Sequence, residues 1–414
     1  MNKVTRIVDF DDKDFDPFFS EEAAFGDTVD PYPRIEELMN ESSVHPIAYR
    51  SIFTDTENVA LRGIKQYTIL GYDAVKEVLM TPEMYLNKAF KYTLGISFGK
   101  SISTMDGEEH QRYRRIFQKT FLPHIVASWG ETLVAPVVER LMDNFVDRGH
   151  ADLVQEFTKH YPFQIIYKQL DLPKEDVQTF HKLAVSQTLY AAYPDAAAEA
   201  GRKLGTYFTE LVAERSANPG DDLVSILATT EVDGERLPLD VLVSFLRQLV
   251  NAAGDTTYRS TSVLLTCLLR NPSQFEAIKN DRSLIPQAIE EGVRWDGPVL
   301  VTQRMSAEDT VLDGKKIEKG ALLNVVLGSA NRDERKFLDP HTFDIFRDPK
   351  HRHLGFAFGP HICIGQHLAR VEITRALDAI FERLPNLRLD PDMPEPDIRG
   401  FLLRVPKHLH VKFG

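Results

Sequence analysis

Hydrophobic residues recur at helical spacing over most of the chain, and the longest such segment runs from about Leu239 to Leu269 and stops at Asn271-Pro272. Between Val241 and Gly254 its only charged residue is Arg247, so we expect protein to cover this helix on nearly all sides. Ala252–Thr257 then places a carboxylate and two hydroxyls inside the apolar cylinder. Buried polar groups need partners, so this stretch is either a solvated defect or a functional site.

Strand patterns are short and few, and they lie apart from the helical segments. We expect strands over Tyr67–Gly71 and Leu409–Phe413, and a hairpin in which Asp313-Gly314 joins Thr310–Leu312 to Lys315–Ile317. Leu322–Leu327 is expected to continue the sheet of that hairpin. No repeat or linker divides the chain. The pattern therefore predicts a mainly α fold with a minor β sheet, in a single domain over residues 1–414.

Composition excludes several classes of protein. Of 414 residues, 43% are hydrophobic, and 49 basic against 61 acidic side chains give a net charge of −12, which excludes general disorder and disfavours nucleic-acid binding. Two cysteines are too few for a disulfide framework or a four-cysteine zinc or iron–sulfur site. The start has no apolar run, so we expect no signal peptide and no membrane anchor. We expect a cytoplasmic protein, and we expect it to be a monomer.

The two cysteines lie in different surroundings. Cys267 is flanked by leucines and is expected to be a core residue. Cys363 follows a loop rich in glycine and aromatic residues and precedes a helical pattern that begins at Gln366. Backbone N–H groups and the positive end of the helix dipole would point at its sulfur, a setting that favours a thiolate. The alternative is a small buried hydrophobe, the usual state of a free cysteine.

The loop Phe356–Gly365 decides between these readings because it resembles the haem-binding loop of the cytochrome P-450 superfamily. The family pattern is Phe-Gly-x-Gly-x-His/Arg-x-Cys-x-Gly, and this sequence differs only at Ala357, where glycine is usual. The resemblance implies haem b between the long central helix and the cysteine loop, with Cys363 as the thiolate ligand of the iron and Phe356 and Gly365 beside the haem. A thiolate ligand favours O–O cleavage.

Haem carries two propionates, and the resemblance implies cationic side chains that would bind them. His110 and Arg114 lie one turn apart on a predicted helix, within a ~60° wedge that also holds Phe117 and Phe121. These two match the His-x-x-x-Arg of the family. Arg304 and His361 match its other two propionate donors.

Two further segments match the family. Ala252–Thr257 resembles its Ala-Gly-x-Asp/Glu-Thr-Thr, in which Ala253 replaces the usual glycine of the groove that binds dioxygen. The resemblance assigns Asp255 to proton relay and Thr256 to stabilising the oxygen-derived group beside it. Glu291 and Arg294 match the Glu-x-x-Arg pair, and Arg347 is expected to complete this structural network.

The resemblance implies a monooxygenase that inserts one oxygen atom from O₂ into a lipophilic small molecule, such as a terpenoid, steroid, fatty acid or aromatic. The expected substrate contacts are mostly apolar: Phe90, Ile96, Phe98, Tyr190, Val250, Asn251, Val299, Leu300 and Phe401. The Asn251 amide would either orient a substrate oxygen or bond the backbone. Two alternatives stay open, a peroxide-driven haem-thiolate peroxygenase and a non-catalytic haem sensor or transport protein.

Electrons are expected from an acidic iron–sulfur ferredoxin and its reductase, because no flavin or nicotinamide fingerprint occurs. The docking face would consist of basic residues that depart from the acidic average: Arg112, Arg115, Lys119, Lys350 and Arg352. The remaining histidines receive structural interpretations. His408 and His410 alternate on the last strand with no acidic partner at ligand spacing, so we expect no zinc site there.

Overall fold

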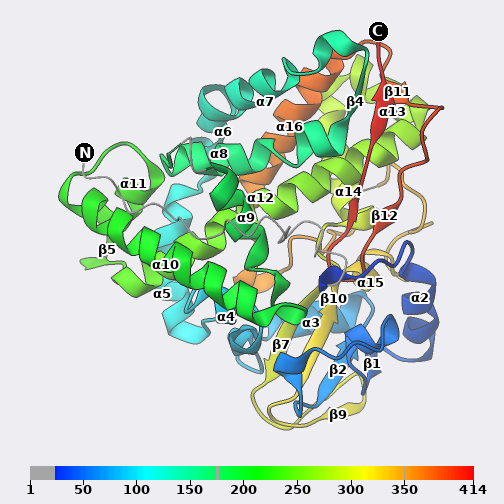
Figure 1. Cartoon of the computed structure of the whole chain (residues 1–414). Coiled ribbons are helices and arrows are strands. Elements are labelled where there is room, and N and C mark those ends of the chain that lie inside the picture. The colour runs from blue at the N-terminus through cyan, green and yellow to red at the C-terminus, as the bar shows by residue number, and fades with distance from the viewer. Residues whose placement is uncertain (1–23, 174–176, 349) are drawn as a thin grey trace.

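Helices make up most of the computed structural model, which describes residues 24–173, 177–348 and 350–414 (Figure 1). The α-helices are α2 (Tyr32–Glu41), α3 (Tyr72–Met80), α4 (Gly95–Phe98), α5 (Gly107–Thr120), α6 (Pro123–Trp129), α7 (Ala135–Met142), α8 (Tyr161–Gln169), α9 (Val177–Ser186), α10 (Pro194–Ala217), α11 (Leu223–Thr229), α12 (Leu239–Arg270), α13 (Pro272–Asn280), α14 (Ile285–Asp296), α15 (Leu327–Asn331) and α16 (Gln366–Arg383). Two π-helical turns, η4 (Gly130–Val134) and η6 (Val154–Thr158), lie beside α7 and α8. The 3₁₀ turns are η1 (Tyr49–Ile52), η2 (Val59–Leu61), η3 (Asn87–Tyr92), η5 (Val146–Arg148), η8 (Leu189–Ala191), η9 (Arg282–Leu284) and η10 (Gly359–His361).

Helix α12 runs through the middle of the helical body, and its bounds confirm the predicted central helix (Figure 1). It packs against α8, α10, α14 and α16, which is why it is apolar on nearly all sides. Gly254 allows the closest of these contacts, because a Cβ there would lie 2.4 Å from Cδ1 of Phe163 on α8. The buried polar stretch of α12 is therefore fixed in position by its neighbours.

The strands gather mainly at one end of the molecule, where β1 (Val44–His45), β2 (Gln66–Ile69), β10 (Leu322–Val326), β7 (Val301–Ser306) and β3 (Tyr85–Leu86) form a sheet in that order (Figure 1). Only the β2–β10 pair among these is parallel. Smaller sheets pair β11 (Arg388–Leu389), β14 (His410–Lys412) and β4 (His150–Asp152), β12 (Ile398–Arg399) with β13 (Val405–Pro406), β5 (Glu231–Val232) with β6 (Glu235–Arg236), and β8 (Thr310–Leu312) with β9 (Lys315–Ile317).

Most strand predictions are confirmed, and one is wrong in its pairing. The hairpin β8–β9 forms around Asp313 and Gly314, both with positive φ, as the Asp-Gly pair predicts. However, β10 does not continue this hairpin. It pairs with β2 and β7 instead, because its five residues are buried and need a neighbour on each edge inside the larger sheet.

The mainly α fold with a minor sheet is as predicted. Among the described residues, no single helix has both the length and the hydropathy to cross a membrane. One bent pair of helical segments, 107–120 and 123–148, meets the length and composition of a membrane span when the two are taken together.

Candidate active site

A cavity of about 340 Å³ lies between α12 and the loop that carries Cys363. Its walls come from η3, α5, α12, the segment before β7, and the loop into α16. The lining is mostly apolar, and its polar members cluster at two places, one around Thr256 and one around Arg114, Arg304 and His361. The cavity therefore brings the predicted cysteine loop, oxygen groove and cationic residues together.

Cys363 faces this cavity, which accounts for its exposed side chain in the interior of the protein. Its backbone N–H donates to Phe356 O at 2.9 Å, which closes the loop. Burial raises the pKa of the Cys363 thiol, while hydrogen bonds from the backbone amides of Gly365 and Gln366 lower it. The lowering expected from the start of the helix is present, but burial outweighs it.

Two residues of the loop have the left-handed backbone that favours glycine. Gly359 has φ +73°, and a Cβ there would lie 2.6 Å from Leu79 O, so only glycine fits. Ala357 has φ +56°, at the position where the family pattern has glycine. The departure noted in the sequence is therefore a point of backbone strain.

The four residues expected to bind propionates lie together. The rings of His110 and His361 stack with centroids 3.7 Å apart, and the Asn87 amide donates to His361 Nδ1 at 2.9 Å. Within the described ranges, no group hydrogen-bonds to buried His110 Nε2. Arg114 donates to Ile362 O in the cysteine loop, and Arg304 is 3% exposed.

Electrostatics indicates that this cluster accommodates an anion. Burial, then the charges of Arg114 and Arg304, lower the pKa of His110 to about 4. Burial, then His110 and the same two arginines, lower the pKa of His361 to about 2, and burial lowers the pKa of Arg304 to about 10. A buried group of mutually repelling donors is stable when negative charge lies between them.

On α12, Thr256 lines the cavity and Asp255 does not. The Thr256 hydroxyl donates to Ala252 O at 2.9 Å, and Ala253 also lines the cavity. The Asp255 carboxylate is buried and pairs through Oδ1 with Arg259 Nε at 3.1 Å and Nη2 at 3.0 Å. The residues of the expected proton relay are therefore neighbours, but the carboxylate is held by a cation one turn further along the helix.

The expected structural network is assembled around Glu291. Its oxygens accept from Arg294 Nε at 2.6 Å and Nη2 at 2.8 Å, from Arg347 Nε at 3.2 Å and from the Asp344 N–H at 2.9 Å. Arg294 also donates to the carbonyls of Asn331 and Pro340. Two separate segments of the chain, α14 and residues 344–347, thus meet at one carboxylate.

The structure separates the expected substrate contacts into two groups. Phe90 and Val299 line the cavity. The others lie outside its lining: Ile96, Phe98, Tyr190, Val250, Asn251, Leu300 and Phe401. The Asn251 amide donates to Ala184 O on α9 at 2.9 Å, so it bonds the backbone, and the Phe401 ring stacks on Phe53.

Among the lining residues that sequence reasoning missed are Phe245, Gln248 and Glu372. Gln248 and Phe245 precede Ala252 by about one and two turns of α12, a spacing that would have identified them once Ala252 faced the cavity. Glu372 lies on α16 with Leu368 and Ala376 one turn away on either side, so an acid on the apolar face was visible in the sequence. Burial raises the pKa of Glu372 well above its usual range.

Comparison with known proteins agrees with this geometry. The family model for cytochrome P450 matches residues 195–413. The chain belongs to the cytochrome P450 family. It is 31% identical over 390 residues to the cytochrome P450 monooxygenase PikC of Streptomyces venezuelae (90% of this chain, 89% of that protein) and 38% identical over 302 residues to a methyl-branched lipid omega-hydroxylase of Mycobacterium bovis (70% and 69%). The solved structure of CYP109E1 from Bacillus megaterium in complex with testosterone has a TM-score of 0.80 and 27% identity, covering 93% of this chain and 99% of that one.

Because the chain belongs to the cytochrome P450 family, it is an oxidoreductase of the monooxygenase type. Its cofactor is haem, held through a cysteine thiolate. The residues present fit that cofactor. The cysteine sulfur faces the cavity, and the cationic cluster with its orphaned His110 nitrogen suits two carboxylates. Gly365 has no atom within 4 Å of the position that a Cβ would occupy, which leaves room for a flat group.

The predicted basic face of this P450 is partly neutralised. Arg112 pairs with Glu235, and Arg115 lies 3.5 Å from Asp233, so both meet the acidic hairpin β5–β6. Lys119, Lys350 and Arg352 of the predicted face are exposed, and Arg352 donates to Gln366 Oε1 at 3.3 Å. Of these three, Lys119 lies at the end of α5 and Arg352 lies nearest in sequence to the cysteine loop.

Proposed function

We propose that this P450 inserts one oxygen atom from O₂ into a lipophilic small molecule that binds in the cavity above Cys363. Cys363 would hold the haem iron, and His110, Arg114, Arg304 and His361 would hold its propionates. The bound haem supplies the redox chemistry that splits dioxygen. The observation that carries the proposal is that Cys363 and Thr256 line one cavity from opposite elements, a loop and α12.

The chain's own residues would then handle protons and water. Thr256 presents a hydroxyl at the cavity wall, and its bond to Ala252 O fixes the direction of the hydroxyl oxygen. Asp255 is the adjacent carboxylate, and we assign it to proton supply after it leaves Arg259. Apolar side chains around them limit the access of water.

The cavity lining supports a lipophilic substrate with a polar group. Phe90, Leu94, Phe245, Leu249 and Val299 form apolar walls. Gln248 donates to Ser103 Oγ, and its Oε1 accepts from no group in the described part of the chain. A substrate hydroxyl or N–H could satisfy that oxygen. A lipophilic ligand agrees with the solved complex of CYP109E1 with testosterone and with the relative named as a methyl-branched lipid omega-hydroxylase.

The spectrum of the reduced carbon-monoxide complex tests the assignment of the ligand. Thiolate ligation by Cys363 predicts a strongly red-shifted Soret band that Cys363→Ser abolishes. Cys267→Ser is the matched control, because that thiol is buried in the core away from the cavity. The proposal fails if the band is absent in the unchanged protein or survives in Cys363→Ser.

Thr256→Ala separates the monooxygenase from a peroxide-driven peroxygenase. We expect haem and substrate to bind normally, while reducing equivalents are diverted to hydrogen peroxide. Thr266→Ala on the same helix removes a hydroxyl with the same bond to a carbonyl four residues back and should leave coupling unchanged. Unchanged coupling in Thr256→Ala, with efficient peroxide-driven turnover, would favour the peroxygenase.

We also propose an acidic ferredoxin as the electron donor, docked near Lys119 and Arg352. Charge reversal by Lys119→Glu with Arg352→Glu should raise the KM for ferredoxin at low salt by about 10-fold, since steering by charge depends on ionic strength. Lys315→Glu with Lys316→Glu on β9 is the control, because this double variant changes the net charge equally on a different element. Unchanged KM and salt dependence in the double variant would refute this docking face.

A further inference from the structure

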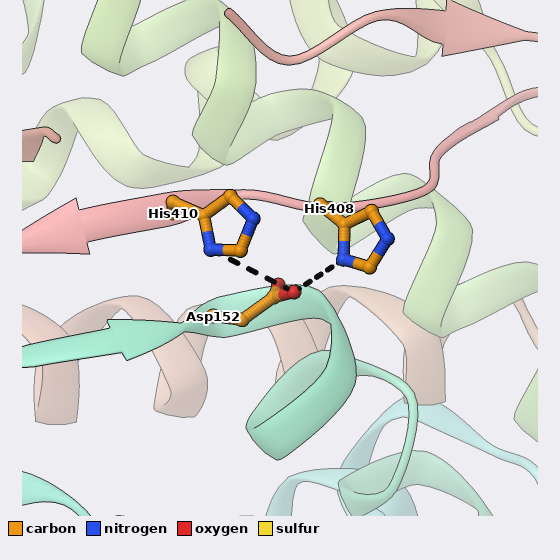
Figure 2. Close-up of side chains that lie close together, drawn as sticks. All are labelled: Asp152, His408 and His410. Carbon is orange, nitrogen blue, oxygen red and sulfur yellow. Dashed lines mark hydrogen bonds and ion pairs between the residues drawn. The ribbon is translucent and has the colours of Figure 1, made fainter. Parts of the chain in front are cut away.

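A second cluster of possible metal ligands lies on the small sheet that contains β4 and β14, outside the cavity (Figure 2). Asp152 ends β4, His410 begins β14, and His408 lies two residues before that strand. Asp152 Oδ2 is 2.6 Å from His408 Nδ1 and 4.0 Å from His410 Nδ1. One ligand atom from each residue lies within 4.8 Å of the other two.

The acidic partner that the sequence did not reveal is supplied by strand pairing. The two imidazole rings are nearly parallel, with centroids 5.3 Å apart, and both present Nδ1 towards Asp152 Oδ2. The antiparallel register sets His410 opposite Asp152, which precedes it by more than 250 residues in the chain. The expectation that His408 and His410 lack an acidic partner is therefore wrong.

The Asp152 carboxylate is held in an orientation that presents one oxygen to the histidines. Its Oδ1 accepts from the backbone N–H groups of Val154 at 3.0 Å, Gln155 at 3.3 Å and Leu409 at 3.0 Å. Oδ2 is left to face the imidazoles (Figure 2). Hydrogen bonds that orient a carboxylate in this way are typical of metal ligands.

We propose that Asp152, His408 and His410 bind a zinc ion. Zinc takes imidazole nitrogens at about 2.0–2.1 Å and carboxylate oxygens at about 2.0–2.2 Å, which sets neighbouring ligand atoms about 3.4 Å apart in a tetrahedron. The two Nδ1–Oδ2 separations lie on either side of that value. Shifts of less than about 1 Å would form three bonds.

The surroundings allow an ion to enter and to keep a water as its fourth ligand. The side chains of His408, His410 and Asp152 are 49%, 26% and 11% exposed. Two nitrogen donors select zinc over magnesium or calcium, which prefer oxygen ligands. Bound zinc would connect β14 to β4 and would stabilise the folded state that brings them together.

Zinc titration of the haem-loaded full chain without affinity-tag histidines tests the proposal. Haem loading keeps Cys363 from competing for zinc. We expect one ion per chain at micromolar affinity by competition with a chromophoric indicator, and a melting temperature that rises with zinc but not with magnesium. His408→Gln and His410→Gln should each weaken binding at least 10-fold. Asp152→Asn retains an oxygen for the three backbone N–H groups and replaces the ligand oxygen, so it should do the same.

The matched control is His341→Gln, because His341 lies with Glu36 and Glu334 in a surface cluster that has only one imidazole. It should leave the high-affinity zinc ion in place. Millimolar binding in the unchanged protein would overturn the proposal. Micromolar zinc binding that persists when both His408 and His410 are replaced would also overturn it. Loss of zinc binding in His341→Gln would overturn it as well. Intact haem spectra in every variant keep this result independent of the monooxygenase assignment.

Discussion

Glu291 and Asp255 are both buried carboxylates paired with arginine on their own helix, but their partners differ. Glu291 accepts from two arginines and a backbone N–H, and Arg347 and Asp344 come from a distant segment. Both contacts of Asp255 with Arg259 reach the same oxygen, and Arg259 lies one turn away on α12. A carboxylate with donors from two segments acts as a brace, whereas one that a single neighbouring side chain holds, among the described residues, can be released by rotation.

Glu291→Gln is the substitution that should break the brace. It leaves the buried Arg294 guanidinium and the partly buried Arg347 guanidinium without their counter-charge, and breaking a buried pair costs about 3–5 kcal/mol. We expect a large drop in the urea midpoint of unfolding and loss of bound haem. Glu276→Gln removes an exposed acid from a pair of the same i,i+3 spacing, with Lys279, and should cost less than about 1 kcal/mol. Equal effects of the two would contradict the structural role of Glu291.

Asp255→Asn should affect turnover more than folding of the haem site. Loss of a proton-delivering carboxylate predicts a fall in kcat of about 100-fold with an unchanged substrate Kd, at the low end for general acid catalysis. Product formation with reconstituted electron donors and substrate titration measure these quantities. Asp240→Asn, in the exposed first turn of the same helix, is the control. If Asp255→Asn keeps full kcat, the ion pair with Arg259 is purely structural.

The residues of both carboxylate sites could be identified from the sequence, but the direction in which their side chains point could not. Loop glycines, the cysteine and the 3.6-residue period are local features, so Cys363, α12 and the cationic residues could be placed from sequence. Arg259 can be identified in the sequence as a partner of Asp255 by the i,i+4 spacing. However, the rotation of α12 that turns Asp255 away from the cavity depends on packing against α8. The same dependence explains why Asn251 and Phe401 face other elements. Asp152 could not be matched to His408 before the β4–β14 register was known.

Glu290, the neighbour of Glu291 on α14, extends the comparison of Glu291 with Asp255 to a carboxylate that is only partly buried. Burial would raise its pKa, but hydrogen bonds from His353 and Arg370 outweigh this and lower the pKa to about 2 from 4.5. A lowered folded-state pKa means that the stabilisation is present above about pH 4.5 and is lost as the pH falls towards 2. Glu290→Gln should therefore flatten the stability profile between pH 5 and 3, measured by urea unfolding. An unchanged slope would show that this pair contributes nothing to folding.

Ala357→Gly should give the smallest effect, in the loop that Glu290 supports through His353 and Arg370. The Arg370 guanidinium lies 4.4 Å from the centre of the ring of Phe356, the residue before Ala357, and Ala357 has a φ of +56°. Glycine relieves that strain and should stabilise the protein by about 1 kcal/mol. Ala277→Gly is the matched control, because Ala277 is also half-buried but helical, and glycine there should cost about 1 kcal/mol. A higher urea midpoint for Ala357→Gly and a lower one for Ala277→Gly would establish that the strain lies in the backbone at residue 357. Lower midpoints for both variants would mean that packing of the Ala357 methyl contributes more stability than its positive φ costs.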